Sequence, residues 1–351
     1  YAAEQLDKSN EGGSVRHAHG EFFLALAETA DMSAESDYGR RYDILPPEWE
    51  NLRAAIDRLA AAGEIELVLR LAIALENFWV ITDPFEGART FESLLAMEGA
   101  SNVLRARAFR CYAGNLYLTG RYDEAQVAND ESLALFQIEG DEAGVAEIRL
   151  RIGINTLTLG DVALAQEQLE ESLALHRELG SPRGEAEAIG ALGYVAQHAG
   201  DFERALALFE ESEEKCAAIG FTWWEASMAS NGADCEFELG RVEEAERKGR
   251  RGLELSRQIG DRQSMVYTVG FLARNAAVRG EITRAGRLWG ALEAEEERAP
   301  VGQWEIDGDR EIYAKAIFAA DAAALEPARR QGRSLSFEAA VDEALGEAPR
   351  R

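Results

Sequence analysis

The sequence predicts an all-α fold, a right-handed solenoid of helical hairpins, and three observations support this prediction. Glycine recurs every 40 residues in one series, at Gly120, Gly160, Gly200, Gly240 and Gly280. A second series falls midway between these positions, at Gly140, Gly180, Gly220 and Gly260. An alanine follows each glycine of the first series after five residues, at Ala125, Ala165, Ala205, Ala245 and Ala285. A fixed period of this length is typical of an array of stacked helical units.

The composition excludes some function classes. The chain has 64 Asp and Glu against 37 Lys and Arg among 351 residues, so its formal net charge is −27. Such an acidic surface repels phosphate backbones, so we expect no direct nucleic-acid binding by this chain. No apolar run of about 18 residues occurs, and the start of the sequence has no apolar signal core, so we expect no membrane span.

The three cysteines, Cys111, Cys216 and Cys235, are odd in number and form no CxxC pair. Reduced thiols in a cytoplasmic protein are the simplest interpretation. The first residue is Tyr1 rather than methionine, so we expect the sequence to be part of a longer protein.

Two helical segments precede the array. Residues 1–64 are interpreted as a helical lead-in, with amphipathic stretches at 15–30 and 49–62. Residues 65–102 are interpreted as a degenerate first hairpin. Its first helix, 65–79, is apolar almost all round and should be buried on most sides. Its antiparallel partner runs from Phe85 to Met97, after a turn with the sequence TDPFEG in place of a tight glycine turn.

Residues 103–298 predict five hairpins, each with a helix A, a glycine turn, a helix B and a second glycine turn. The third hairpin illustrates why each position of the repeat holds a particular type of residue. Gly193 lets helix A approach its neighbour, and Gly200 can take the left-handed conformation that ends this helix. Phe202 fills the space between the two helices, and Ala205 lets helix B cross helix A tightly.

The same registers repeat in the other units. The small position on helix A is filled by Ala113, Gly153, Gly193, Ala233 and Ala273. The apolar position two residues after the turn is filled by Tyr122, Val162, Phe202, Val242 and Ile282. Gly249 and Gly252 lie inside helix B of the fourth unit and cost about 1 kcal/mol each relative to alanine, so we expect local distortion there. Residues 299–351 predict a C-terminal helical cap, with helices at 305–324 and 325–331 and a short helix capped by Ser336.

These registers resemble the tetratricopeptide repeat, in a long-helix form found in bacterial regulators, because the period is 40 rather than about 34. The flanking stretches RHAHGEFFLALAETA, EWENLRAAIDRLAAAGE and RAGRLWGALEAEEER resemble parts of bacterial signal-transduction ATPases with numerous domains. Such ATPases often carry LuxR-type transcriptional output domains. No Gly-Lys phosphate loop occurs in this sequence, and no basic DNA-reading helix follows Leu345. The resemblance therefore implies the sensor or scaffold arm of such a regulator.

Helical spacing directs a set of helix A residues toward the inner, concave face of the array, where a groove could hold a peptide or a partner helix. The candidate ligand-binding residues are Arg110, Tyr117, Tyr194, Gln197, His198, Asp234, Phe237, Tyr267 and Arg274. The alternative for each aromatic residue is simple packing between adjacent units. Among these residues, Tyr194 and Arg274 are the best single candidates.

Other conspicuous residues have structural interpretations. We expect Asn115, Asn155 and Asn275, which share one register, to form hydrogen bonds between units. Of the pair Trp223 and Trp224, one should fill the core, and the other would suggest an interface if it were exposed.

Histidines and acidic runs are likewise interpreted as structural. His176 should be a surface residue near a helix C-terminus. The acidic runs 210–214 and 293–297 should be solvated faces. His17 and His19 are two residues apart and point to different sides of a helix, so we expect no metal site.

The sequence contains no nucleophile, base and orienting group at a recognised spacing, so we expect no catalytic residues, no cofactor and no enzyme activity. The main hypothesis is an interaction arm of a bacterial regulatory ATPase or transcriptional regulator that binds a protein, a peptide or a small effector. The alternative is a free-standing scaffold or peptide receptor.

Overall fold

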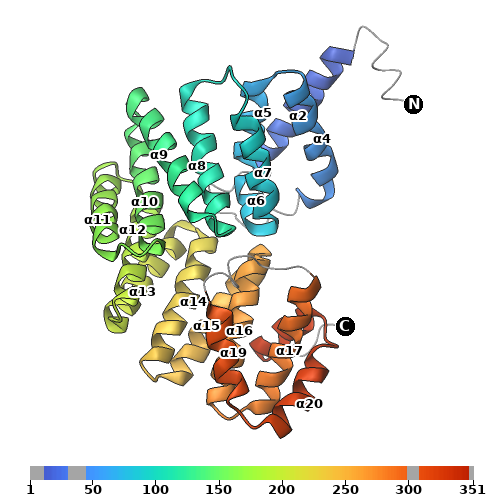
Figure 1. Ribbon diagram of the computed structural model, residues 1–351, viewed down its shortest axis with the longest axis vertical. Coiled ribbons are helices and arrows are strands. Elements are labelled where there is room, and N and C mark those ends of the chain that lie inside the picture. The colour runs from blue at the N-terminus through green and yellow to red at the C-terminus, as the bar shows by residue number, and fades with distance from the viewer. Residues whose placement is uncertain (1–11, 31–44, 299–307, 348–351) are drawn as a thin grey trace. The chain divides into compact units, whose positions relative to one another are not determined.

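The computed structural model describes residues 12–30, 45–298 and 308–347, and every regular element in these segments is a helix (Figure 1). The predicted all-α class is thus confirmed. The chain divides into two compact units, Tyr1–Asn155 and Thr156–Arg351. Over the described residues, no helix combines the length and the hydropathy needed to cross a membrane.

The first unit begins with short helices around α5. Their bounds are α2 (Gly12–Ala30), η1 (Pro46–Glu48), α4 (Trp49–Ala61), α5 (Ile65–Ala74), α6 (Glu76–Thr82) and α7 (Pro84–Leu95). The single helix predicted for 65–79 is wrong, because the chain bends at Leu75 between α5 and α6. The bend allows Phe78 and Trp79 to pack against Trp49, with ring centroids 4.5 and 6.0 Å apart.

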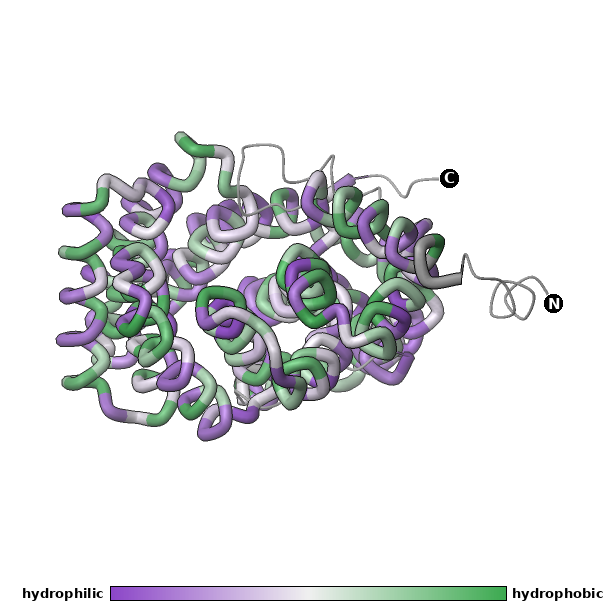
Figure 2. The backbone as a smooth tube through the Cα atoms, turned by 90° about the horizontal axis from the view of Figure 1, so that it is seen from above, coloured by the Kyte–Doolittle hydropathy of each residue, from purple (hydrophilic) through white to green (hydrophobic). Residues whose placement is uncertain are grey.

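The ten helices of the array follow with a constant period of 40 residues. They are α8 (Asn102–Leu118), α9 (Tyr122–Glu139), α10 (Glu142–Thr158), α11 (Val162–Glu178), α12 (Pro182–His198), α13 (Phe202–Ile219), α14 (Thr222–Glu238), α15 (Val242–Ile259), α16 (Arg262–Val278) and α17 (Ile282–Arg298). Hydrophobic and hydrophilic residues alternate around the helical turns in Figure 2, as expected for helices buried on one side.

Both glycine series have the conformation that the sequence predicts. All nine glycines have positive φ, between 61° and 97°, and therefore end their helices in the left-handed region. The five alanines of the lattice are completely buried. The predicted interhelical apolar residues, such as Phe202, are each the first residue of a helix B.

The proposed division of the chain at residues 64, 102 and 298 stays a prediction.

Glycines inside helices lie where neighbouring segments come close. A Cβ atom on Gly193 would lie 2.5 Å from Cε1 of Phe209, so the predicted close approach is confirmed. The distortion predicted at Gly249 and Gly252 is wrong, because α15 is one continuous helix. A Cβ on Gly252 would lie 2.3 Å from Oγ of Ser230. These glycines therefore allow close packing rather than bending the helix.

The C-terminal segment has three described helices, α19 (Asp309–Phe318), α20 (Ala322–Gly332) and α21 (Phe337–Leu345). The predicted boundary at 324/325 is wrong, because Asp321 caps α20 by accepting a hydrogen bond of 3.0 Å from the backbone N–H of Ala323. Residues 305–307 of the predicted helix lie outside the described residues. Ser336 caps α21 as predicted, with Ala339 N–H donating to its Oγ at 3.2 Å.

Helices α17 and α20 cross with almost no side chains between them. A Cβ on Gly290 of α17 would lie 2.0 Å from the backbone oxygen of Arg329, and one on Gly332 of α20 would lie 2.0 Å from the backbone oxygen of Arg287. Backbone atoms cannot rotate out of the way as a flexible side chain can. This crossing therefore requires glycine.

We predict that Gly290→Ala lowers the free energy of unfolding by about 1–3 kcal/mol, because the added methyl group forces the two backbones apart. The matched control is Gly232→Ala in α14, where the nearest atom to an added Cβ is 3.5 Å away. That change should stabilise the protein by about 0.5–1 kcal/mol through helix propensity. Urea denaturation followed by circular dichroism measures both effects. Equal effects of the two substitutions would contradict this account of the crossing.

Candidate functional site on the helix-A face

The first helices of the last three repeats, α12, α14 and α16, are linked by polar side chains in the second unit. The Tyr194 hydroxyl lies 3.2 Å from Oγ of Ser227, and Nδ2 of Asn231 donates to the same hydroxyl at 3.3 Å. Ser230 and Thr268 connect α14 to α16 through hydroxyl oxygens 3.2 Å apart. We call the side of α12, α14 and α16 that carries Tyr194, Gln197, Asp234, Phe237, Tyr267 and Arg274 the helix-A face.

The part of this face in the third repeat is accessible. Gln197 is half-buried and His198 is exposed, with Nδ1 of His198 lying 3.1 Å from the backbone oxygen of Tyr194. The ring of Tyr194 contacts Phe209 and Trp224 at centroid distances of 5.3 and 6.3 Å. Tyr194 therefore packs between neighbouring repeats, as the alternative interpretation predicts. Its side chain is half-buried, so part of it remains accessible on the helix-A face.

Four of the candidate residues meet in the last two repeats. The carboxylate of Asp234 accepts a hydrogen bond of 2.8 Å from Tyr267 and lies 3.5 Å from Nη1 of Arg274. Arg274 also donates to Glu238 at 2.5 Å, and its guanidinium lies 3.7 Å from the ring centroid of Phe237. Asp234 and Arg274 are 6% and 7% exposed. They form a buried ion pair that joins α14 to α16.

Burial raises the pKa of Asp234 to about 6. Hydrogen bonds from Tyr267 and Tyr313 and the positive charge of Arg274 act in the opposite direction and limit the rise. The carboxylate of Asp234 is thus a strong acceptor that has lost most of its contact with water.

Tyr313, which was not among the predicted site residues, completes this cluster. Its hydroxyl lies 2.9 and 3.1 Å from the two carboxylate oxygens of Asp234, and its ring contacts those of Tyr267 and Phe271 at 5.8 and 6.3 Å. Tyr313 belongs to α19, which follows the last repeat and has no 40-residue register. The only sequence signal was an apolar pair at helical spacing, Tyr313 and Ile317.

The other two candidate residues lie in the first unit. Both terminal nitrogens of Arg110 donate to the carboxylate of Glu76, at 3.0 and 2.6 Å, and Nη1 also lies 3.2 Å from Glu147. Tyr117 packs against Tyr122 with ring centroids 5.2 Å apart. These contacts hold helices together.

The acidic run 293–297 is not the solvated face that the sequence predicted. Glu293, Glu295 and Glu296 are buried, because arginines from other parts of the second unit reach them. The contacts are Arg329 with Glu293 at 2.7 Å, Arg262 with Glu295 at 2.7 Å and Arg310 with Glu296 at 3.1 Å.

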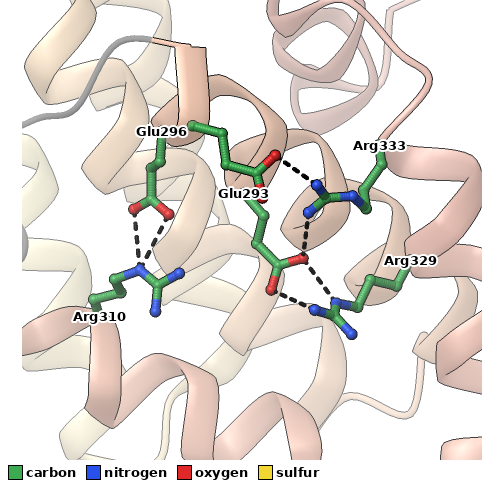
Figure 3. A pocket seen from close by; sticks show the side chains of 6 residues that line it. Glu293, Glu296, Arg310, Arg329 and Arg333 are labelled. Atoms are coloured by element: carbon green, nitrogen blue, oxygen red, sulfur yellow. Dashed lines mark hydrogen bonds and ion pairs between the residues drawn. The ribbon is translucent and has the colours of Figure 1, made fainter.

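Part of this run lines a cavity of about 240 Å³, together with Arg310 of α19, Arg329 of α20 and Arg333, which directly follows α20. Figure 3 shows these side chains around the cavity. Each of its three arginines forms an ion pair with a glutamate, so the charges that line the cavity balance. These ion pairs connect α17 to α19, to α20 and to the residue that follows α20. In the run 210–214, Glu210, Glu211 and Glu214 are exposed as predicted.

Two of the three asparagines form the predicted hydrogen bonds between neighbouring repeats. Nδ2 of Asn155 donates to the backbone oxygen of Tyr122 at 3.1 Å, and Nδ2 of Asn275 donates to that of Val242 at 3.2 Å. Asn115 instead donates within its own helix, to the backbone oxygen of Cys111 at 2.9 Å.

The prediction for His176 is wrong, because this residue is buried. It shares its register with Phe136, Cys216 and Ser256, all of which are buried. A Cβ on Gly184 would lie 2.0 Å from Nδ1 of His176, so the ring fills the space that this glycine leaves. The register of the repeat, rather than the nearby helix end, determines its position.

The tryptophan pair and the cysteines are largely core residues. Trp224 is buried and donates to Oγ of Ser212 at 3.1 Å, as predicted for one member of the pair, and Trp223 is half-buried. All three cysteines are buried and free. Burial raises the pKa of Cys216 and of Cys235 to about 12, which makes these thiols poor nucleophiles.

Comparison with known proteins agrees with this architecture. The family model of the tetratricopeptide repeat matches residues 104–178 and 144–218. Residues 104–218 therefore consist of tetratricopeptide repeats, and the chain has the fold of a tetratricopeptide-repeat solenoid.

The chain is also similar to proteins named as HTH-type transcriptional regulators from Mycobacterium tuberculosis and Mycobacterium bovis. Identity is 25% over 224 residues, which are 64% of this chain and 22% of each relative. The chain thus spans about a fifth of the length of the curated relatives it matches.

Three solved structures share the fold. A Rap protein complexed with Competence and Sporulation Factor has a TM-score of 0.59 at 13% identity, covering 95% of this chain and 90% of that one. NprR in complex with its cognate peptide NprX has a TM-score of 0.58 at 13% identity, covering 81% and 85%. A signal-transduction ATPase with numerous domains and a tetratricopeptide-repeat sensor from Pyrococcus horikoshii has a TM-score of 0.52 at 14% identity, covering 96% and 55%.

We predict that Asp234→Asn changes the pH dependence of stability. Because the folded-state pKa of Asp234 is raised from 3.8 to about 6, its contribution is fully present below pH 3.8 and lost as the pH rises through 6. The free energy of unfolding of the wild type, minus that of Asp234→Asn, should therefore fall by about 3 kcal/mol between pH 3.8 and 7.

Urea denaturation at a series of pH values measures this difference, and Glu211→Gln, which removes one exposed carboxylate, provides the control. A difference for Asp234→Asn that is constant with pH, or that rises, would show that the carboxylate is not destabilised by burial.

Proposed function

We propose that this chain is the interaction arm of a larger bacterial regulator, a transcriptional regulator or a regulatory ATPase, and that its helix-A face recognises a protein, a peptide or a small effector. The observation that carries the proposal is the similarity over 224 residues to regulators of which the chain spans only 22%. A tetratricopeptide-repeat segment in such a protein provides a recognition surface. The greater length of the relatives favours an arm over a free-standing scaffold.

The residues of the helix-A face support binding of a polypeptide. The face presents the half-buried ring of Tyr194 and the amide of Gln197, and the exposed imidazole of His198 lies next to Gln197 in sequence; together they offer both stacking and hydrogen bonds. Stacked hairpins contact chiefly their neighbours, so a ligand that bridges several helices A changes the spacing between units. In this proposal, such a change passes the bound state of the arm to the rest of the regulator.

Several further features belong to this proposal. The arm is non-catalytic and works in the cytoplasm, without a cofactor or a metal ion. It binds no nucleic acid directly, because the formal charge of −27 opposes association with phosphate backbones. DNA recognition would belong to an output domain of the regulator.

Photo-crosslinking tests the role of the helix-A face. We predict that p-benzoylphenylalanine at Gln197 gives defined crosslinked products in bacterial cells, which mass spectrometry identifies. The matched control places the same group at Glu211, which is exposed on α13 of the same repeat. Identical products from both positions, or none from Gln197, would exclude this face as the recognition surface.

A further inference from the structure

Helix α19 lies on the helix-A face of the fourth and fifth repeats, where the proposed function places a ligand. Tyr313 is 2% exposed and reaches the carboxylate of Asp234 on α14, while its ring lies against Tyr267 and Phe271 of α16. Ile317, one helical turn later, is completely buried. The helix thus inserts an aromatic side chain and an aliphatic side chain, four residues apart, in the manner of a bound helical peptide.

The remainder of α19 buries little of its surface. Tyr313 and Ile317 are its only buried residues among those whose side chains are described. Ile312 is 55% exposed. Phe318 is 44% exposed, and its ring lies 6.3 Å from that of Trp289 on α17 and 5.3 Å from the guanidinium of Arg329 on α20. Arg310 adds an ion pair to Glu296 of α17. A helix of ten residues is unstable by itself in water, so these few contacts determine whether α19 stays in place.

The neighbouring helix α20 is attached differently. It crosses α17 with direct contact between backbones at Gly290 and Gly332, and Arg329 forms an ion pair with Glu293. Two described side chains of α19 are buried, against three residues of α20 and six of α21, so α19 is the described C-terminal helix with the fewest buried residues. Segments with few buried apolar contacts open most readily from the folded state.

The surface beneath α19 defines the chemistry of what can replace it. Asp234 offers a buried acceptor for a hydroxyl donor, Tyr267 and Phe271 offer ring surfaces, and Arg274 lies 5.2 Å from the centroid of the Tyr313 ring. A phenol satisfies all of these groups at once. Without a donor in this position, Asp234 would lose one of its partners in a buried site.

We propose that α19 is an intramolecular ligand that blocks this part of the helix-A face, and that a partner protein binds there by displacing it. The displacing segment is a short helix that carries a tyrosine and, four residues later, an aliphatic side chain. This inference rests on the proposed function of the helix-A face. A tethered segment acts at an effective concentration in the millimolar range, so α19 lowers the affinity for the partner until it opens.

A synthetic peptide of residues 308–320 with a fluorescent label provides the probe, and fluorescence anisotropy measures its binding to the full chain. We expect Tyr313→Ala combined with Ile317→Ala to bind the peptide at least about tenfold more tightly than the wild type, because the site is vacated. Ile312→Ala is the matched control on the exposed side of α19, and it should behave as the wild type. The same peptide with alanine in place of its tyrosine should not bind.

Hydrogen exchange of the wild type provides a second test that needs no variant. We expect amides of α19 to exchange at least about tenfold faster than those of α16 and α20. Equal protection of the three helices would show that α19 is a permanent cap and would overturn the proposal. A folded double variant that does not bind the peptide would overturn it as well.

A failure of the intramolecular-ligand proposal can be distinguished from a failure of the proposed function. Crosslinking at Gln197 probes the third repeat, whereas α19 covers residues of the fourth and fifth. Crosslinks at Gln197 together with a permanently protected α19 would leave the interaction arm in place and remove only the intramolecular ligand.

Discussion

The close approach of helices at positions without large side chains is the constraint on which the rest of this structure depends. Completely buried alanines recur at one position in every repeat, and glycines such as Gly193 leave space for an aromatic ring of the adjacent helix. At the α17–α20 crossing, backbone atoms meet directly at Gly290 and Gly332. Because interiors are densely packed, adding one methyl group at such positions affects both helices.

The close packing of helices also brings polar groups of successive helices A within hydrogen-bonding distance. Tyr194 reaches Ser227 on the next helix A, and Tyr267 and Arg274 reach back to Asp234. Burying these groups is tolerable only because they are paired. Residues that make a surface suitable for recognition are therefore the same residues that connect one repeat to the next, and a ligand that competes for them would act on the interface between repeats.

The repeat architecture could be predicted from the sequence because it depends on local, periodic features. Left-handed glycines end helices wherever they occur, and the register determines which side of a helix is buried. The same rule explains two errors. His176 is buried because its register is buried, and Gly252 continues the buried register of Ser132, Ser172 and Ser212. Phe78 and Trp79 pack against Trp49 across a bend that no periodicity indicates.

The completion of the site could not be predicted, because Tyr313 and the arginines of the C-terminal segment are far from their partners in sequence. Tyr313 is 79 residues from Asp234, and Arg329 is 36 residues from Glu293. The acidic run at 293–297 resembles a solvated face until the positions of those arginines are known. Only tertiary structure supplies this information, since the segment after the last repeat has no register to follow.

The constant length of the unit has a consequence for how such a chain can change over evolutionary time. Each helix B begins 40 residues after the previous one, from Tyr122 to Ile282, without an insertion in any turn. Gain or loss of one whole unit by recombination would therefore join a helix to a partner of the same register. The stability of such an array is close to a sum over units and their junctions, so the array can be lengthened or shortened without designing a new core.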